Sequence, residues 1–163
     1  MDSTKQVIDT ETAGVIMRPP LLFIGALLLG FVLDHVLALQ FPLQRSDLIH
    51  WIVASCLILT GITVFVASVR NFARAATPVP GNQPTRVLVT NGIHGWSRNP
   101  IYVGMFLVYC GVGTAVRSPS ILILMVPLAI TIRYGVVARE EAYLERRFDQ
   151  AYRDYKARVR RWL

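Results

Sequence analysis

The sequence predicts an all-α membrane protein with about four transmembrane helices, a helical hairpin formed by the last two, and a cytoplasmic C-terminal amphipathic helix. Three observations support this fold class. Hydrophobic residues make up 53% of the 163 residues, they are collected in long runs, and the arginines gather beside those runs. Soluble domains of this size are less apolar, and disordered chains do not cluster apolar residues in this way. We expect a single domain over residues 1–163.

The first two spans are predicted within residues 19–69. The segment before them, residues 1–18, is predicted to be cytoplasmic, and its first twelve residues lack the basic start, apolar core and cleavage site of a signal peptide. Residues 19–41 are long enough to cross a bilayer core of about 30 Å at a rise of about 1.5 Å per residue. Residues 48–69 form the second apolar run, with a histidine and a tryptophan near one interface.

Two shorter apolar runs follow, and then a charged tail. Residues 101–116 and 121–137 are each short for a full span, so we expect a tight helical hairpin over residues 101–137 whose ends borrow flanking residues. In the tail, residues 138–163, apolar and aromatic side chains recur close to helical spacing. The tail is therefore predicted to be an amphipathic helix that lies on the membrane or against the preceding loop.

The positions of the basic residues predict the orientation, because short cytoplasmic loops carry an excess of lysine and arginine. Of the 17 lysines and arginines, all but Arg45 and Arg117 lie near the two ends of the chain or in residues 70–100. We therefore predict a multi-pass integral membrane protein with both termini in the cytoplasm. The loop 70–100 and the tail would face the same compartment, and a functional site is expected between them.

Several other functions are disfavoured by the sequence. The net charge of +7 does not indicate nucleic-acid binding, since no basic stripe alternates with exposed aromatic residues. Cys56 and Cys110 lie inside apolar runs without a CxxC pattern, so we expect packing residues. No metal site is expected from Asp34, His35 and His50: the first two are adjacent, so they point to different faces of a helix, and no third ligand has zinc-like spacing.

Two polar clusters flank the last two apolar runs. The first is SRNPIYVG, residues 97–104, in which a proline at a helix start and a polar cap would be ordinary. The second is Glu140 and Glu141, a pair that anionic headgroups repel but that a helix N-terminus favours. Each cluster alone has a purely structural explanation. Together they could form one site, in which Arg98 fixes an anionic group and a glutamate holds a cation or accepts a proton.

The sequence LVTNGIHGWSRNPIYVG, followed after the hairpin by EEAYLERRFDQAYRDYKARVRRW, resembles the C-terminal half of the isoprenylcysteine carboxyl methyltransferases and their phospholipid methyltransferase relatives. The resemblance covers roughly residues 77–162, and the first two spans match only as generic membrane helices. It implies an integral membrane enzyme that takes S-adenosyl-L-methionine from the cytosol. The implied partner is a lipidic or prenylated small molecule that arrives from the bilayer.

The resemblance also implies the site residues. Cofactor contacts are expected from Arg86, Val87, Leu88, Val89, His94, Asn99, Pro100, Ile101, Tyr102 and Glu140. Arg98 and Glu141 would face the acceptor and take part in catalysis. The chemistry of the cofactor agrees, because Glu140 suits its ammonium group, the Asn-Gly turn suits its carboxylate and Val-Leu-Val suits its adenine. Arg98 could hold a carboxylate acceptor through two parallel hydrogen bonds.

The chain departs from the family pattern at three positions. Asn99 stands where the family usually has histidine, His94 where it often has tyrosine, and Val136 where the carboxyl methyltransferases have arginine. We favour isoprenylcysteine-type carboxyl O-methylation, since Arg98 suits an anionic acceptor. The alternatives are phospholipid amine N-methylation, and a scaffold or carrier that keeps the fold without catalysis. A related membrane reductase would need a glycine-rich dinucleotide loop, and none is present.

Overall fold

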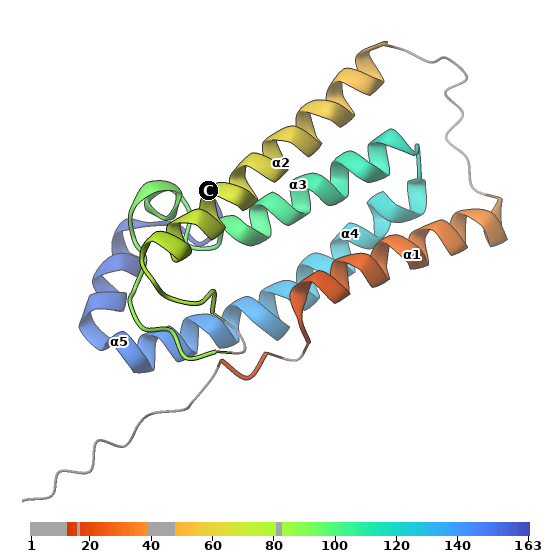
Figure 1. The fold of residues 1–163 in the computed structure, drawn as a ribbon. Helices are drawn as coiled ribbons and strands as arrows, with labels where there is room; N and C mark the ends of the chain where they lie inside the picture. Colours follow the sequence, from red (N-terminus) through yellow and green to blue (C-terminus); the bar gives the residue numbers. More distant parts are fainter. Residues whose placement is uncertain (1–12, 16, 39–47, 81–82) are drawn as a thin grey trace, which may run out of the picture.

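The computed structural model describes residues 13–15, 17–38, 48–80 and 83–163, and every regular element within them is helical, which confirms the predicted all-α class. Figure 1 shows the arrangement of the helices and the loop that precedes α3. The elements are α1 (Pro19–Leu37), α2 (Leu48–Arg74), the 3-10 helix η1 (Gly92–Gly95), α3 (Pro100–Ala115), α4 (Pro119–Thr131), the π-helix η2 (Ile132–Val137) and α5 (Ala138–Arg158).

Within the described residues, three helices are long and apolar enough to cross a membrane: α1, α2 and the continuous helix Pro119–Arg158. The apolar part of the third is α4 with η2, because α5 carries charged side chains in every turn. The helix α3 is also apolar but has only 16 residues. The four predicted apolar helices are therefore present, and one of them is short.

Two of the predicted span boundaries need comment. The second helix continues to Arg74 instead of ending at residue 69, so the first residues of the predicted loop 70–100 are helical. Arginine near a helix end can extend its charged head to the interface while its stem stays among apolar groups, so Arg70 and Arg74 do not end the helix. The last residues predicted for the first span, 39–41, lie outside the described residues.

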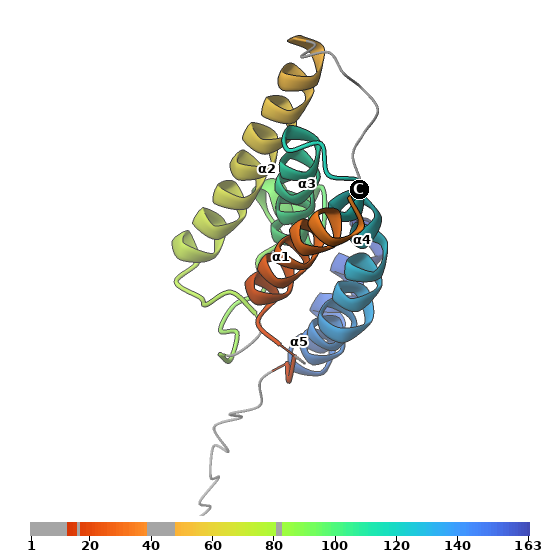
Figure 2. The same cartoon turned by 90° about the vertical axis from the view of Figure 1, so that its right-hand side faces the viewer.

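The helices associate as two closely packed pairs. The helix α2 runs along α3, and α1 runs along α4, while α3 also contacts α1 and α4 (Figures 1 and 2). The turn from α3 to α4 is short, and the Ser118 backbone N–H donates to the Gly113 carbonyl at 2.9 Å. The tight connection expected for the helical hairpin is thus present.

Glycines bring α2 and α3 together. A Cβ atom added at Gly104 would lie 2.7 Å from the Gly61 carbonyl oxygen, which is too short for a carbon–oxygen contact. The two backbones therefore touch at this point, as small residues allow in membrane helix pairs. This contact lies one turn after Pro100 and fixes the first turn of α3 against α2.

At the opposite end of the bundle, Asp34 has a structural role. Its carboxylate accepts hydrogen bonds from the Ser118 hydroxyl and, at 3.1 Å, from the Ser120 backbone N–H at the start of α4. A carboxylate at a helix N-terminus satisfies backbone donors and interacts favourably with the helix dipole. Asp34 therefore joins α1 to α4.

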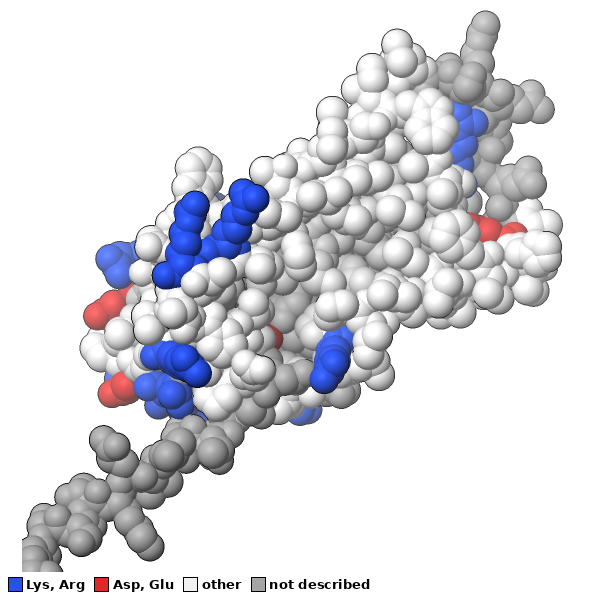
Figure 3. Space-filling model, viewed as in Figure 1, with Lys and Arg blue, Asp and Glu red and all other residues white. Residues whose placement is uncertain are grey.

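The end of α2, loop residues 75–80 and 83–99, the start of α3 and α5 all lie at one end of the molecule (Figure 1). Figure 3 shows that most of the charged side chains on this face gather there, whereas the surface of the helix bundle carries few. The loop and the tail thus share one end, as the predicted orientation requires. That this end faces the cytoplasm stays a prediction.

Candidate functional site

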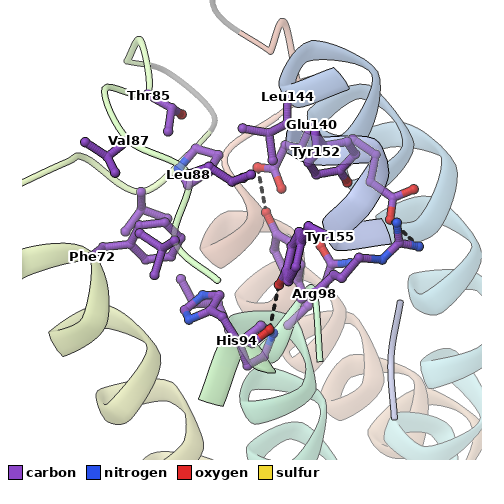
Figure 4. Close-up of a pocket in the computed structure, with 18 residues that line it drawn as sticks. Phe72, Thr85, Val87, Leu88, His94, Arg98, Glu140, Leu144, Tyr152 and Tyr155 are labelled. Atoms are coloured by element: carbon purple, nitrogen blue, oxygen red, sulfur yellow. Dashed lines mark hydrogen bonds and ion pairs between the residues drawn. The ribbon is translucent and has the colours of Figure 1, made fainter. Parts of the chain in front are cut away.

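A pocket of about 600 Å³, counting its open mouth, lies between the loop, the start of α3 and α5. Figure 4 shows Glu140, Leu144 and Tyr152 reaching into it from α5, Phe72 from α2, and Val87 and Leu88 from the loop. All the site residues expected from the resemblance line this pocket except Arg86. Residues separated by more than fifty positions in the sequence therefore meet in one concave site.

Glu140 lies deep in the pocket beside the first turn of α3. Its side chain accepts a hydrogen bond from the Tyr102 hydroxyl at 2.9 Å, and the residue is only 6% exposed. Burial raises the pKa of Glu140 to about 8; the Tyr102 hydrogen bond opposes the rise and the charge of Glu141 adds to it. Near neutral pH the carboxyl group is largely protonated, and a bound cation would favour its ionisation.

Glu141 is paired with two arginines from different parts of the chain. Arg98 Nη2 lies 3.2 Å from Glu141 Oε1. Arg161 contacts both carboxylate oxygens, with Nε 3.0 Å from Oε1 and Nη2 2.7 Å from Oε2. The cluster thus holds two guanidinium groups and one carboxylate.

Arg98 has hydrogen-bond donors in this cluster that are not bonded to Glu141. Its side chain is 7% exposed, and its buried Nε and Nη1 atoms find no hydrogen-bond partner among the described residues. Leaving buried charged donors unpaired is energetically costly, so such donors are typical of a ligand site. Each of these two donors is available to the carboxylate or another anionic group of a ligand.

Asn99 holds the C-terminal segment as well as lining the pocket. Its Nδ2 donates to the Arg161 carbonyl oxygen at 3.1 Å, and its backbone N–H donates to Ser97 Oγ at 3.1 Å. Asn99 occupies the N-cap position of α3 without a capping hydrogen bond from its side chain, and Pro100 is the first helical residue. The predicted proline start of the helix is confirmed, and the asparagine binds the tail.

His94 is a buried, neutral residue that connects three elements. Asn71 Nδ2 lies 3.4 Å from its Nδ1, and Ser68 Oγ lies 3.2 Å from its Nε2. Its carbonyl oxygen accepts from the Tyr155 hydroxyl at 2.7 Å. Burial lowers the pKa of His94 to about 4. Both ring nitrogens already have protein partners, so the ring face is the part that remains for a cofactor contact.

The loop is attached to α5 and to its own beginning. The Thr85 backbone N–H donates to the Tyr143 hydroxyl at 3.0 Å, and the Arg86 N–H donates to Thr77 Oγ1 at 2.8 Å. These bonds hold Val87, Leu88 and Val89 against the pocket. The Arg86 residue itself is exposed and does not line the pocket.

The Asn-Gly turn, which was expected to bind the carboxylate of the cofactor, does not line the main pocket. Gly92 has a φ of +56°, which suits glycine, and the Asn91 carbonyl accepts from Asn71 Nδ2 at 3.0 Å. Gly92 lines a separate groove with Trp96 and Leu163. The turn is therefore not positioned to bind the carboxylate of a cofactor in the main pocket.

Several lining residues were not singled out from the sequence: Phe72, Val79, Pro80, Thr85, Leu144, Tyr152 and Tyr155. The helical spacing of the tail aromatics was a signal for Tyr152 and Tyr155, but spacing alone does not show what they face. The helix α5 breaks at Asp149, where φ is 43° and ψ is −117°. The break turns the second half of α5 back toward the pocket, and it could not be predicted because neither glycine nor proline stands at this point.

Comparison with known proteins was informative for most of the chain. Residues 49–151 match the model of a family described as phospholipid methyltransferase. The chain is 32% identical over 146 residues to a protein-S-isoprenylcysteine O-methyltransferase of Dictyostelium discoideum, covering 82% of this chain and 57% of that protein. A segment of 34 residues is 63% identical to an uncharacterized protein of Haemophilus influenzae, covering 21% of this chain and 54% of that protein. The chain thus spans somewhat over half the length of both relatives.

Proposed function

The chain belongs to the phospholipid methyltransferase family, and from this premise we propose that it uses S-adenosyl-L-methionine to methylate the carboxylate of a lipidic acceptor of the isoprenylcysteine type. One observation carries the proposal. The buried guanidinium of Arg98 presents two unpaired donors, Nε and Nη1, in the lining of the pocket. A carboxylate matches either of these donors in charge and as a hydrogen-bond acceptor. The name of the Dictyostelium relative supports the same acceptor.

The residues of the pocket fit the proposed methyl donor. S-Adenosyl-L-methionine has a cationic ammonium and sulfonium at one end and an apolar adenine ring at the other. Glu140 offers a carboxylate for the cationic end, and Leu88, Val89 and Phe72 offer apolar surface for the ring.

The proposed reaction depends on the alignment of the acceptor carboxylate with the methyl group and needs no acid–base catalysis. Bound S-adenosyl-L-methionine supplies an electrophilic methyl group on sulfur. A carboxylate oxygen forms the new bond to carbon as the carbon–sulfur bond breaks and its electron pair stays on sulfur, so no proton moves. Arg98 would hold the carboxylate in line, and Glu141 would hold Arg98. The neutral ester product has lost the charge that Arg98 binds, which favours its release.

An apolar groove on the surface of the helix bundle offers a lipidic acceptor a route to the site. A groove of about 760 Å³ runs between α1, α2 and α3, and its lining includes Phe23, Leu27, Phe65 and Met105. Figure 3 shows a hollow on this face, with an acidic side chain visible at the end toward α5. Met105 lies one helical turn after Ile101, which lines the main pocket. The groove and the main pocket are thus lined by successive turns of α3.

Binding is the first test. S-Adenosylhomocysteine is titrated calorimetrically into detergent-purified protein, for the wild type and for Glu140→Ala. We expect micromolar binding to the wild type and at least about a tenfold loss in the variant, as for removal of one charged partner of a buried pair. Folded wild-type protein that binds none would exclude the proposed cofactor.

Methyl transfer is the second test and separates the acceptors. Labelled donor is offered with an S-prenylated cysteine free acid, with its carboxamide, and with phosphatidylethanolamine vesicles. We expect transfer to the acid only, since the carboxamide lacks the charge and the nucleophilic oxygen. Binding of the cofactor without transfer to any acceptor would favour the non-catalytic scaffold or carrier.

Phospholipid amine N-methylation remains the second candidate, on two observations. The matching family is described as phospholipid methyltransferase, and Val136 is fully buried in the hydrophobic core. Position 136 therefore does not supply the second guanidinium group that an arginine there would offer to a carboxylate. An amine acceptor would have to lose a proton, and the Glu140 carboxylate, once ionised beside a bound cation, is the group in the pocket lining that we propose to receive it. Transfer to phosphatidylethanolamine in the same assay would select this function.

A further inference from the structure

The last residues of the chain return to the start of α3. The Arg98 backbone N–H donates to the Arg160 carbonyl at 3.0 Å, and Ser97 Oγ donates to the Arg161 carbonyl at 3.3 Å. Asn99 Nδ2 donates to that same carbonyl, and Trp162 packs against the hydrophobic core. The backbone of Arg161 is therefore held beside Arg98 by contacts that do not involve its own side chain.

The Arg161 side chain makes more hydrogen bonds to the Glu141 carboxylate than the Arg98 side chain does. Its Nε and Nη2 face both carboxylate oxygens, at 3.0 Å to Oε1 and 2.7 Å to Oε2. Arg98 reaches only Oε1, through Nη2 at 3.2 Å. A carboxylate binds one guanidinium by a parallel pair of hydrogen bonds at a time. Because Arg161 makes that pair, Nε and Nη1 of Arg98 stay unbonded.

Arg161 also sets the charge of the cluster. Arg98 and Glu141 alone would form a neutral pair, whereas Arg161 adds a second positive charge next to a buried carboxylate. The side chains of Arg98 and Glu141 are only 7% and 9% exposed, so solvent screens this excess weakly. The result is a buried site that favours an anion.

We propose that Arg161 is a positioning and specificity-determining residue: it holds Glu141 away from paired contact with Arg98, so that the unbonded donors of Arg98 stay available to the anionic group of the acceptor. Arg161 lies outside the residues that line the pocket and acts through Glu141. The inference rests on the proposed carboxylate acceptor. It adds that the selectivity for an anion comes from the C-terminal segment.

The kinetic test compares Arg161→Ala and Arg161→Lys with Arg160→Ala. Arg160 is exposed and offers its backbone carbonyl to Arg98, so its side-chain variant removes one positive charge from the same segment without touching Glu141. For transfer to an S-prenylated cysteine free acid, we expect Arg161→Ala to raise KM about tenfold or more, as for loss of a charge-assisted contact. The affinity of Arg161→Ala for S-adenosylhomocysteine should stay within about twofold of wild type. The kinetic constants of Arg160→Ala should also stay within about twofold of wild type.

Arg161→Lys should give a KM between those of wild type and Arg161→Ala, because lysine keeps the charge but not the paired geometry. Equal KM values for Arg161→Ala and Arg160→Ala would overturn the proposal. So would an Arg161→Ala variant that loses cofactor and acceptor affinity to the same extent, since that pattern indicates general disruption of the pocket.

A second measurement does not depend on methyl transfer. The Nε–H resonance of Arg98 is followed in spectra of ¹⁵N-arginine-labelled protein and assigned by its absence in Arg98→Lys. In Arg161→Ala we expect this resonance to shift as Glu141 takes up Arg98 in paired contact, and in Arg160→Ala we expect no shift. If the wild type methylates no acid but the shift occurs, the proposed function fails and the positioning role stands. If the acid is methylated and the resonance does not shift, the positioning role fails.

Discussion

Two neighbouring glutamates at the start of α5 have different environments. Glu141 is neutralised by guanidinium groups of Arg98 and Arg161, whereas Glu140 meets the Tyr102 hydroxyl and is otherwise buried. Successive residues on a helix point about 100° apart, so adjacent carboxylates reach different partners. A pair of identical side chains thus offers one charged group and one that is easily protonated.

The raised pKa of Glu140 makes stability depend on pH. The pKa is about 8 in the folded protein against an ordinary value of 4.5, so between these values the folded protein binds more protons than the unfolded one. The contribution of Glu140 to the free energy of unfolding is therefore fully present below pH 4.5 and is lost as the pH rises through 8.

We expect Glu140→Gln to remove this dependence. Thermal unfolding in detergent between pH 5.5 and 8.5 should show the wild type losing stability relative to the variant as the pH rises. Glu145→Gln is the control, because Glu145 lies on the same helix in a surface ion pair with Lys156. Parallel curves for the wild type and Glu140→Gln would mean that Glu140 titrates normally.

At the scale of single elements, departures from a regular α-helix position the site. The π-helix η2 comes three residues before Glu140, and π segments shift the register of the helix that follows. The break at Asp149 then turns Tyr152 and Tyr155 toward the pocket. The helix from Pro119 to Arg158 is therefore irregular at two points, and the site residues follow each of them.

The α2–α3 contact gives a prediction for one element pair. We expect Gly104→Ala to lower the free energy of unfolding by about 1–3 kcal/mol, because the new Cβ would lie 2.7 Å from the Gly61 carbonyl oxygen. Gly25→Ala in α1 is the matched control, since a Cβ there meets nothing within 4 Å.

The measurement is a denaturant titration of both variants in the same detergent. Gly25→Ala should be neutral or slightly stabilising, because alanine favours a helix over glycine by up to about 1 kcal/mol. Equal effects of the two substitutions would show that α2 and α3 do not touch at Gly104.

At the scale of the whole molecule, all parts of the candidate site lie at one end of an apolar helix bundle. The donor would come from water and the acceptor from lipid, and a pocket at the end of the bundle is open to both. The membrane therefore limits the directions from which each substrate can approach. The distribution of lysine and arginine predicts that this end is cytoplasmic.

The orientation can be tested with single cysteines in a background that lacks Cys56 and Cys110. Trp96→Cys lies at the pocket end and Val116→Cys at the opposite end, at residues that are 81% and 46% exposed. In sealed inside-out vesicles we expect a membrane-impermeant thiol reagent to label the first and not the second. Labelling of the second alone would reverse the predicted topology.

The sequence by itself determined the features that depend on neighbouring residues. Apolar runs predicted the four helices, Pro100 marked the start of α3, and the two polar clusters contain seven of the eighteen residues that line the pocket. Such features are local, because helix length, hydrophobicity and proline geometry are properties of a short segment.

Only the tertiary structure decided which of these residues share contacts. Asn99 and the Arg161 carbonyl are 62 positions apart, and Glu141 meets Arg161 only because the chain turns back after Arg158. The break at Asp149 likewise occurs at a residue that is neither glycine nor proline. These features arise because the packing of distant segments stabilises backbone geometries and charge pairs that the local sequence does not favour.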